Sequence, residues 1–173
     1  MKAGVIAPSK ISYIVQATKR SESEVESLLK RITKIIAENN LEIVITPDKK
    51  SPLEFVGKEY LKLKGKKLYE VLPLDDTELG YKEWVNTDLG EAINCGTWRN
   101  QPEKTNDVTD LLICVGYGVG SFIEMGYSKW FRPKPIYIIN ELVSGKLPME
   151  FEKSLKIKYI SVNDLDKELK KLR

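Results

Sequence analysis

The sequence predicts a doubly wound α/β fold with a mainly parallel, Rossmann-like sheet. Short apolar, β-branched runs alternate with segments of helical periodicity, and most connections between them are short. The run at 111–115, Leu-Leu-Ile-Cys-Val, is apolar throughout, as expected of a central strand covered on both faces. Such alternation favours right-handed crossovers and a parallel sheet, here of at least five strands. Sheets of this kind bind ligands beyond the carboxyl ends of their strands, where the strand order reverses.

Length and composition limit the class of protein further. The chain has 173 residues, 42% of them hydrophobic and 31% charged, which predicts a single globular domain over 1–173. No apolar run approaches the roughly 20 residues that span a membrane, and the N-terminus shows no export signal, so we expect no membrane partner. The cysteines, Cys95 and Cys114, lack paired spacing, which favours a reducing compartment and a cytoplasmic location.

Charge and residue types exclude several chemistries. The net charge of +3 is too small to argue for a nucleic-acid partner. The sequence contains no histidine, which excludes His-dependent triads and His-ligated zinc. The acidic residues between 75 and 91 show no metal-ligand spacing, so we expect neither a metal nor a cofactor.

The first half of the chain predicts alternating strands and helices. Ser21 and Glu24 form a capping box ahead of apolar residues at helical spacing, and Ser51-Pro52 provides a cap and a first-turn proline for the next helix. The predicted elements are strands at 5–7, 41–46 and 67–72, and helices that begin after residue 21 and at residue 52.

The second half opens with residues 74–96, which are polar and poorly periodic. They form either a functional loop or a short element that the pattern does not resolve. The elements predicted after them are helices at 99–108, from Ser121 to about 130, and from about Asn163, with strands at 111–115, 135–139 and 157–162.

A glycine-rich turn follows the most apolar strand and is the strongest candidate for a binding site. Residues 116–121 read Gly-Tyr-Gly-Val-Gly-Ser and open a helix. Glycines let a ligand approach the backbone, and a helix N-terminus offers N–H groups to a phosphate. We expect the backbone of Gly118, Val119, Gly120 and Ser121 to bind the ligand, with Ser9 lining the cleft. The alternative is that the glycines only make a tight strand-to-helix turn.

Two charged residues are candidates for catalysis. Glu124 is expected in the first turn of that helix, where a carboxylate could stabilise a cationic sugar transition state or act as base or nucleophile. The structural alternative is a capping box between Ser121 and Glu124. Arg99 opens the preceding helix and could grip a phosphate, unless it is an ordinary solvated arginine. Trp84 and Trp98 could stack on a base, although packing is the commoner role of tryptophan.

Several segments resemble the SLOG superfamily, which includes the LOG phosphoribohydrolases formerly labelled lysine decarboxylases. Residues 117–124, Tyr-Gly-Val-Gly-Ser-Phe-Ile-Glu, are similar to the end of the family motif G-G-x-G-T-x-x-E. The resembling segments also include Trp98-Arg99-Asn100 before the strand at 111–115, the helix and strand of 52–73 ending in V-L-P, and Lys134-Pro135-Ile136. The resemblance runs from about residue 5 to residue 140.

The resemblance implies a Rossmann-like homodimer that binds a nucleotide or phosphorylated sugar. It further implies hydrolysis of the N-glycosidic bond of a nucleoside 5′-monophosphate, with Glu124 stabilising the transition state and Arg99 holding the phosphate or orienting the ribose. This sequence departs from the family where Thr46-Pro47-Asp48 replaces paired glycines and Val115-Gly116-Tyr117-Gly118 replaces P-G-G. These departures favour a protein that binds nucleotides without cleaving them as the main alternative.

Two more alternatives stay open. Residues 124–127, Glu-Met-Gly-Tyr, are similar to the E-I-G-Y segment of nucleoside 2-deoxyribosyltransferases, in which that glutamate is the nucleophile. The DNA-processing relatives of the group suggest a nucleic-acid-binding module, which steep salt dependence of binding would reveal.

Overall fold

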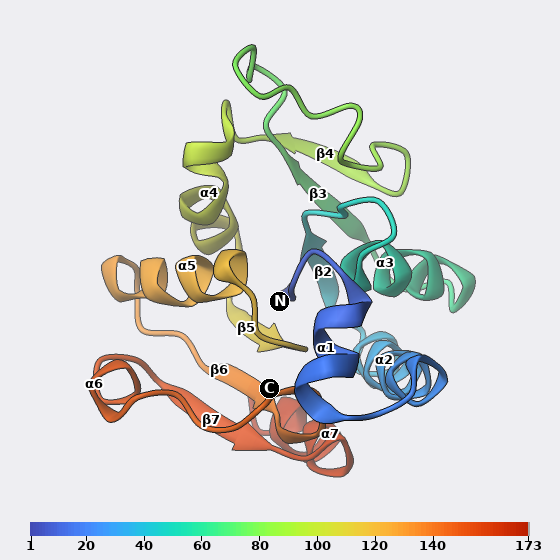
Figure 1. Ribbon diagram of the computed structural model, residues 1–173, viewed down its shortest axis with the longest axis vertical. Coiled ribbons are helices and arrows are strands. Elements are labelled where there is room, and N and C mark those ends of the chain that lie inside the picture. The colour runs from blue at the N-terminus through green and yellow to red at the C-terminus, as the bar shows by residue number, and fades with distance from the viewer. Residues whose placement is uncertain (173) are drawn as a thin grey trace.

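The computed structural model describes residues 1–172, which form one seven-stranded sheet with the order β4-β3-β2-β1-β5-β6-β7 (Figure 1). Every neighbouring pair of strands is parallel. The strands are β1 (Lys2–Ile6), β2 (Glu42–Ile45), β3 (Leu68–Leu72), β4 (Glu91–Asn94), β5 (Leu111–Cys114), β6 (Ile136–Ile139) and β7 (Ile157–Ile160). The strand order reverses between β1, in the middle, and β5 beside it, so the ligand-binding edge is expected there.

Helices cover both faces of this sheet (Figure 1). One face is covered by α1 (Ile11–Thr18), α2 (Glu22–Glu38), α3 (Pro52–Lys62) and α7 (Val162–Lys170). The other face is covered by α4 (Gln101–Val108), α5 (Val119–Tyr127) and the short α6 (Met149–Glu152). Short 3₁₀ turns are η1 (Trp98–Asn100), η2 (Ser128–Trp130) and η3 (Asn140–Leu142). The predicted doubly wound α/β fold is confirmed.

The helix signals in the first half of the sequence act as predicted. The Ser21 hydroxyl accepts the Glu24 N–H, and the Glu24 carboxylate accepts the Ser21 N–H at 2.8 Å, which completes the capping box of α2. The Ser51 hydroxyl likewise accepts the Glu54 N–H at 3.1 Å at the start of α3. Each cap satisfies a backbone donor that the helix itself leaves unpaired.

The structure corrects the predicted start of α5. The helix begins at Val119, not at Ser121, because Ser121 bonds back to Gly118 and so occupies the third helical position. Glu124 therefore lies in the second turn rather than the first, and no capping box forms between it and Ser121. The predicted helix at 99–108 is η1 followed by α4.

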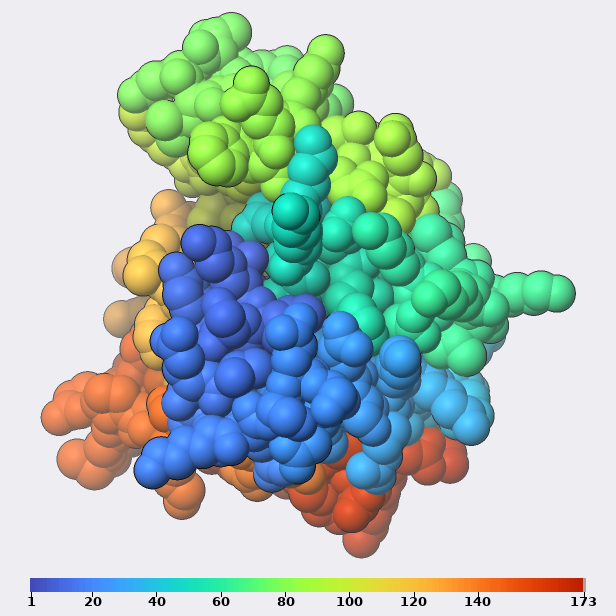
Figure 2. All heavy atoms as spheres, turned by 45° about the vertical axis from the view of Figure 1, so that its right-hand side comes forward, coloured from blue at the N-terminus to red at the C-terminus, as the bar shows by residue number. Residues whose placement is uncertain are grey.

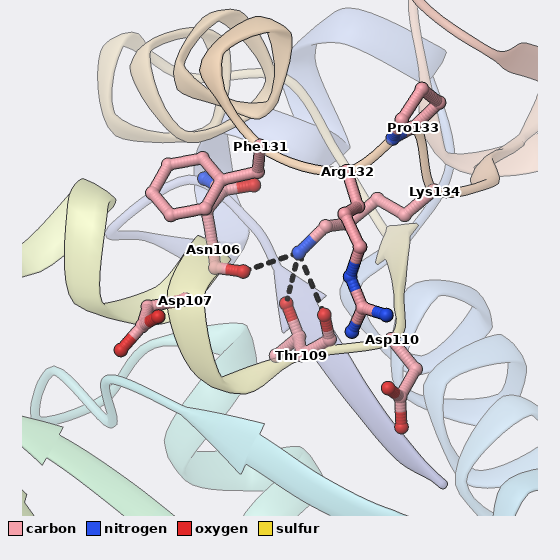
Figure 3. A pocket seen from close by; sticks show the side chains of 8 residues that line it. All are labelled: Asn106, Asp107, Thr109, Asp110, Phe131, Arg132, Pro133 and Lys134. Carbon is pink, nitrogen blue, oxygen red and sulfur yellow. Dashed lines mark hydrogen bonds between the residues drawn. The ribbon is translucent and has the colours of Figure 1, made fainter.

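Lys134 lies just before β6, and its ammonium group points toward the segment that joins α4 to β5 (Figure 3). Its ammonium group donates to the backbone oxygens of Asn106 and Thr109, the latter at 2.7 Å, and to the Thr109 hydroxyl at 3.2 Å. A cation at the carboxyl end of α4 complements the negative end of the helix dipole. The pocket around Lys134 therefore lies where α4, β5 and β6 pack together.

None of the helices among residues 1–172 is long and apolar enough to cross a membrane.

Candidate functional site

A cleft of about 840 Å³ opens at the carboxyl-terminal edge of the sheet. One wall is the start of α1, the floor is the turn after β2, and the opposite wall is the long loop between β3 and β4 with the adjoining η1. Figure 2 shows this loop as the lobe above the N-terminal segment, with side chains near residue 50 rising toward it. The lining residues are Ser9, Lys10, Ile11, Ser12, Glu22, Asp48, Lys49, Lys50, Leu79, Glu83, Trp84 and Trp98.

The long loop, residues 73–90, is a fixed wall because Asp76 anchors it. The Asp76 carboxylate accepts the backbone N–H groups of Glu78, Leu79 and Trp98 at 3.1, 2.8 and 3.0 Å. These hydrogen bonds hold the pKa of Asp76 below its ordinary value. The Trp98 indole also donates to the Gly80 carbonyl at 2.7 Å, which ties the loop to η1.

The floor and the loop are hydrogen-bonded to each other. The Lys49 N–H donates to the Trp84 carbonyl at 2.7 Å, and the Asn86 N–H donates to the Pro47 carbonyl at 3.0 Å. Asp48 pairs with Val85 in an antiparallel bridge between the same two segments. The floor and this wall of the cleft therefore form one connected unit.

The same unit presents large apolar side chains to solvent. Trp84 is 61% exposed and Leu79 is 67% exposed, while Trp98 is half-buried. Exposed aromatic and aliphatic surface inside a concave site is typical of small-molecule binding sites. Lys10, Lys49 and Lys50 supply positive charge around the same cleft.

Asp48 is half-buried on the floor of the cleft. Its burial raises the pKa of the carboxyl to about 6. Among residues 1–172, no side chain or backbone group donates a hydrogen bond to this carboxylate. Asp48 is therefore an acceptor that the folded chain leaves unused.

Glu124 lies deeper at the same edge, only 6% exposed. Its carboxylate accepts Gln101 Nε2 at 2.8 Å, and the same nitrogen lies 2.8 Å from the Thr46 hydroxyl oxygen and 3.0 Å from that of Thr105. Burial raises the pKa of Glu124 to about 7, and the charge of Asp48 adds to this effect. The group therefore exchanges a proton near neutral pH instead of remaining a fixed anion.

The first two glycines of the 116–120 turn serve packing. Gly116 has φ +148°, and a Cβ there would lie 2.8 Å from an Ile14 carbon and 2.9 Å from Pro8 Cδ. A Cβ on Gly118 would lie 2.9 Å from Pro8 Cα. The turn after β5 thus presses against the turn after β1, and no Cβ would be obstructed at Gly120.

The start of α5 still offers backbone donors, although Gly118 and Ser121 are engaged with each other. The Ser121 hydroxyl accepts the Gly118 N–H at 2.8 Å and donates to the Gly118 carbonyl at 2.9 Å. Val119 and Gly120 are exposed at the helix terminus. Because Gly118 packs on Pro8, this terminus adjoins Ser9, which lines the cleft.

Arg99 is not brought to Glu124. Its side chain is 75% exposed and forms an ion pair with Glu78 at 2.7 Å. Its predicted role remains a prediction, as does that of Glu124.

Sequence reasoning missed Asp48 as a candidate and missed Gln101 entirely. Asp48 had one available signal, its place directly after a predicted strand, whereas Gln101 had none.

Comparisons with known proteins establish the fold. No family model and no curated protein matches the chain. Among solved structures, the chain is similar to the molybdenum cofactor binding protein from Rippkaea orientalis, with a TM-score of 0.70, 15% identity, and coverage of 99% of this chain and 96% of that one. It is also similar to the molybdenum cofactor carrier protein from Chlamydomonas reinhardtii, with a TM-score of 0.69, 15% identity and the same coverage, 99% and 96%. The Rossmann-like fold that the SLOG resemblance implies is thus confirmed.

Proposed function

We propose that this protein binds a nucleotide, or a similar phosphorylated molecule with a planar ring, in the cleft at the carboxyl-terminal edge of the sheet. The observation that carries the proposal is the combination of exposed indole and lysine side chains in one cleft of about 840 Å³. A planar ring gains from stacking on tryptophan, and a phosphate gains from nearby ammonium groups. The solved structures of similar fold include proteins that bind or carry the molybdenum cofactor, which supports a small-molecule ligand.

The phosphate has two adjoining places to bind. Lys10, Lys49 and Lys50 surround the cleft. The second is the start of α5 behind Ser9, the backbone site proposed at Gly118, Val119, Gly120 and Ser121. Because the Gly118 N–H already donates to the Ser121 hydroxyl, the phosphate would contact the remaining N–H groups. A phosphate at Ser9 would lie between the lysines and the helix terminus, where both favour negative charge.

A thermal-shift and calorimetry panel of nucleoside 5′-monophosphates tests this function. A bound mononucleotide raises the melting temperature by mass action. Lys10→Ala should weaken binding, whereas Lys34→Ala, at an exposed lysine on α2 outside the cleft, should not. Failure of every mononucleotide to bind contradicts the proposal. Single-stranded DNA that binds instead, with steep salt dependence, would support the nucleic-acid alternative.

Hydrolysis of the N-glycosidic bond is a second candidate, and the Glu124 environment favours it. A carboxyl with a pKa of about 7 can give its proton to the departing base as the bond between C1′ and the base nitrogen breaks, and then recover a proton from the water that bonds to C1′. Arg99 would have to leave Glu78 to reach a phosphate. That exchange is feasible because exposed ion pairs are weak.

Following free base by chromatography separates hydrolysis from binding. Wild type should release base from a nucleoside monophosphate, and Glu124→Gln should lose this activity. Arg99→Ala should weaken turnover if it holds the phosphate. Binding without turnover by wild type would support a carrier or sensor, while undiminished turnover by Glu124→Gln would remove this residue from the mechanism. Ribosyl transfer to a second base would favour the deoxyribosyltransferase-like alternative.

We further propose a homodimer formed through the outer face of α5 and η2. Val119 and Trp130 are 78% and 77% exposed, and Phe122 and Ile123 are exposed between them. The only charged residue of α5 is Glu124, which is buried. The outer face of α5 is apolar and uncharged, so two-fold pairing along this helix brings no like charges together. In η2, the ammonium group of Lys129 lies over the Trp130 ring at 5.4 Å from its centroid, at the end of this face. We also place the protein in the cytoplasm, since Cys95 and Cys114 are buried and unpaired.

A further inference from the structure

The floor of the cleft contains an acceptor that suits one particular ring edge. Asp48 has two carboxylate oxygens and no hydrogen-bond donor among the described residues. The other carboxylates of the cleft, Glu22 and Glu83, belong to exposed residues. A half-buried carboxylate without a partner carries a desolvation cost that a ligand with two adjacent N–H groups can offset.

We propose that Asp48 determines the ring specificity of the ligand and that this ligand carries a 2-amino-4-oxopyrimidine ring, as guanine and the pterins do. The inference rests on the proposed function and names the substrate class for the same cleft. The ring N–H and the neighbouring amino N–H point in the same direction, so a carboxylate accepts both at once.

Other purines match a carboxylate less well. Hypoxanthine offers one N–H at this edge, and xanthine places a carbonyl oxygen beside its N–H. Adenine places an acceptor nitrogen beside its amino group, which would leave that nitrogen facing a carboxylate oxygen. The expected order of affinity is therefore guanine first, hypoxanthine second, and adenine and xanthine last.

The position of Trp84 supports a ring beside Asp48. Lys49 and Trp84 are joined by a backbone hydrogen bond of 2.7 Å, and Asp48 pairs with Val85 in the same bridge. The exposed indole and the unused carboxylate therefore sit on two backbone segments that are held together, and both residues line the cleft. Stacking on Trp84 would contribute affinity for any base, whereas Asp48 would discriminate among bases.

Calorimetry with GMP, IMP, AMP and XMP at pH 7.5 tests the inference, because these ligands share one ribose phosphate. The pKa of about 6 leaves Asp48 ionised at this pH. Wild type should bind GMP at least about tenfold more tightly than AMP or XMP, as one good bidentate contact provides. Asp48→Asn replaces one acceptor by a donor, so it should abolish the preference for GMP and favour XMP. Neopterin, which has the same ring edge and lacks the ribose phosphate, distinguishes a pterin ligand from a guanine nucleotide.

Two variants make the result specific. Glu103→Gln, at an exposed carboxylate on α4 that does not line the cleft, should leave the GMP preference unchanged. Trp84→Leu should lower the affinity for all four nucleotides by a similar factor, roughly tenfold, without altering their order of affinity. Equal binding of the four nucleotides by wild type, or a GMP preference that survives Asp48→Asn, overturns the inference while leaving the proposed function intact. If no nucleotide binds but neopterin does, the ring assignment stands and the nucleotide proposal fails.

Discussion

Glu124 lies in the second turn of α5, where its carboxylate accepts a hydrogen bond from Gln101 and burial raises its pKa. Its pKa rises from 4.5 to about 7, so between these two pH values the folded protein keeps a proton on Glu124 that the unfolded chain releases. The contribution of protonated Glu124 to the free energy of unfolding is fully present below about pH 4.5. It is lost as the pH rises to about 7. Asp48 acts in the same direction, since its pKa rises from 3.8 to about 6.

Glu124→Gln should therefore stabilise the protein more at pH 8 than at pH 5. The difference in unfolding free energy should be up to about 3 kcal/mol, because one pKa unit corresponds to about 1.4 kcal/mol. Urea denaturation at both pH values measures it. Glu103→Gln, at an exposed carboxylate on α4, is the matched control and should show little difference. Equal effects of Glu124→Gln at both pH values would contradict the assigned burial cost.

Lys134 gives a residue-scale prediction about stability alone. Lys134→Met keeps the length of the side chain but removes the donor to the Asn106 and Thr109 carbonyls. We expect a loss of about 2–4 kcal/mol in urea denaturation, because buried acceptors are left unpaired. Lys153→Met, at an exposed lysine, should change stability by less than about 0.5 kcal/mol. A neutral Lys134→Met would mean that water replaces the ammonium group without cost.

At the scale of elements, the turn after β5 is shaped by its contact with the turn after β1. Gly116→Ala should destabilise the protein by about 2 kcal/mol or more, because φ is +148° and the new Cβ would meet Ile14 and Pro8. Gly120→Ala has open space and a helical position, so it should be neutral or stabilise by up to about 1 kcal/mol. Thermal denaturation of both variants compares them. Equal effects would argue against the close packing of the two turns.

The loop between β3 and β4 supplies the second prediction about an element. Asp76→Ala removes the acceptor shared by Glu78, Leu79 and Trp98, so amide hydrogen exchange should accelerate at these three positions. The exchange of β5 amides should stay unchanged, because that strand lies in the interior of the sheet. Nucleotide affinity should fall with the loss of the fixed wall. Unchanged exchange at Leu79 would show that Trp98 and Gly80 suffice to hold the loop.

Sequence patterns revealed the elements that carry strong local signals. The capping box at Ser21 and the apolar run of β5 gave a helix and a strand close to their observed bounds. The α1 helix was missed because Lys10 gives no side-chain cap. β4 is the short element that was left open within residues 74–96, and the pattern does not resolve it because this edge strand is largely exposed and polar. The short α6 also lacks a side-chain cap.

The candidate site was harder to predict because it depends on contacts across the sheet. Ser9 could be placed near the binding edge because it follows the first strand, whereas Trp84 was recognised only as a side chain that could stack on a base. The burial of Glu124 and its bond to Gln101 join residues that are 23 positions apart, and no local pattern encodes such a pair. Arg99 shows the same limit, because only the fold reveals its ion pair with Glu78.

At the scale of the whole molecule, one face of α5 packs against the sheet and the opposite face is exposed to solvent. Its inner face buries Ser121, Glu124 and Met125 against the sheet, while its outer face exposes apolar side chains. The helix therefore connects the candidate site to the proposed dimer contact. A partner on the outer face would cover Val119, which begins the helix beside the predicted phosphate site.

Ile123→Lys should convert the dimer to a monomer, because two-fold pairing would bring two ammonium groups into an apolar contact. Because Ile123 is 45% exposed, the substitution should leave the fold of the monomer intact. At a protein concentration low enough to dissociate the dimer, the melting temperature of Ile123→Lys should equal that of wild type. Leu61→Lys, at a residue 44% exposed on α3, is the matched control and should remain dimeric. Sedimentation equilibrium at micromolar concentration measures both variants. A monomeric wild type would contradict the dimer itself, and a dimeric Ile123→Lys would place the contact elsewhere on the molecule.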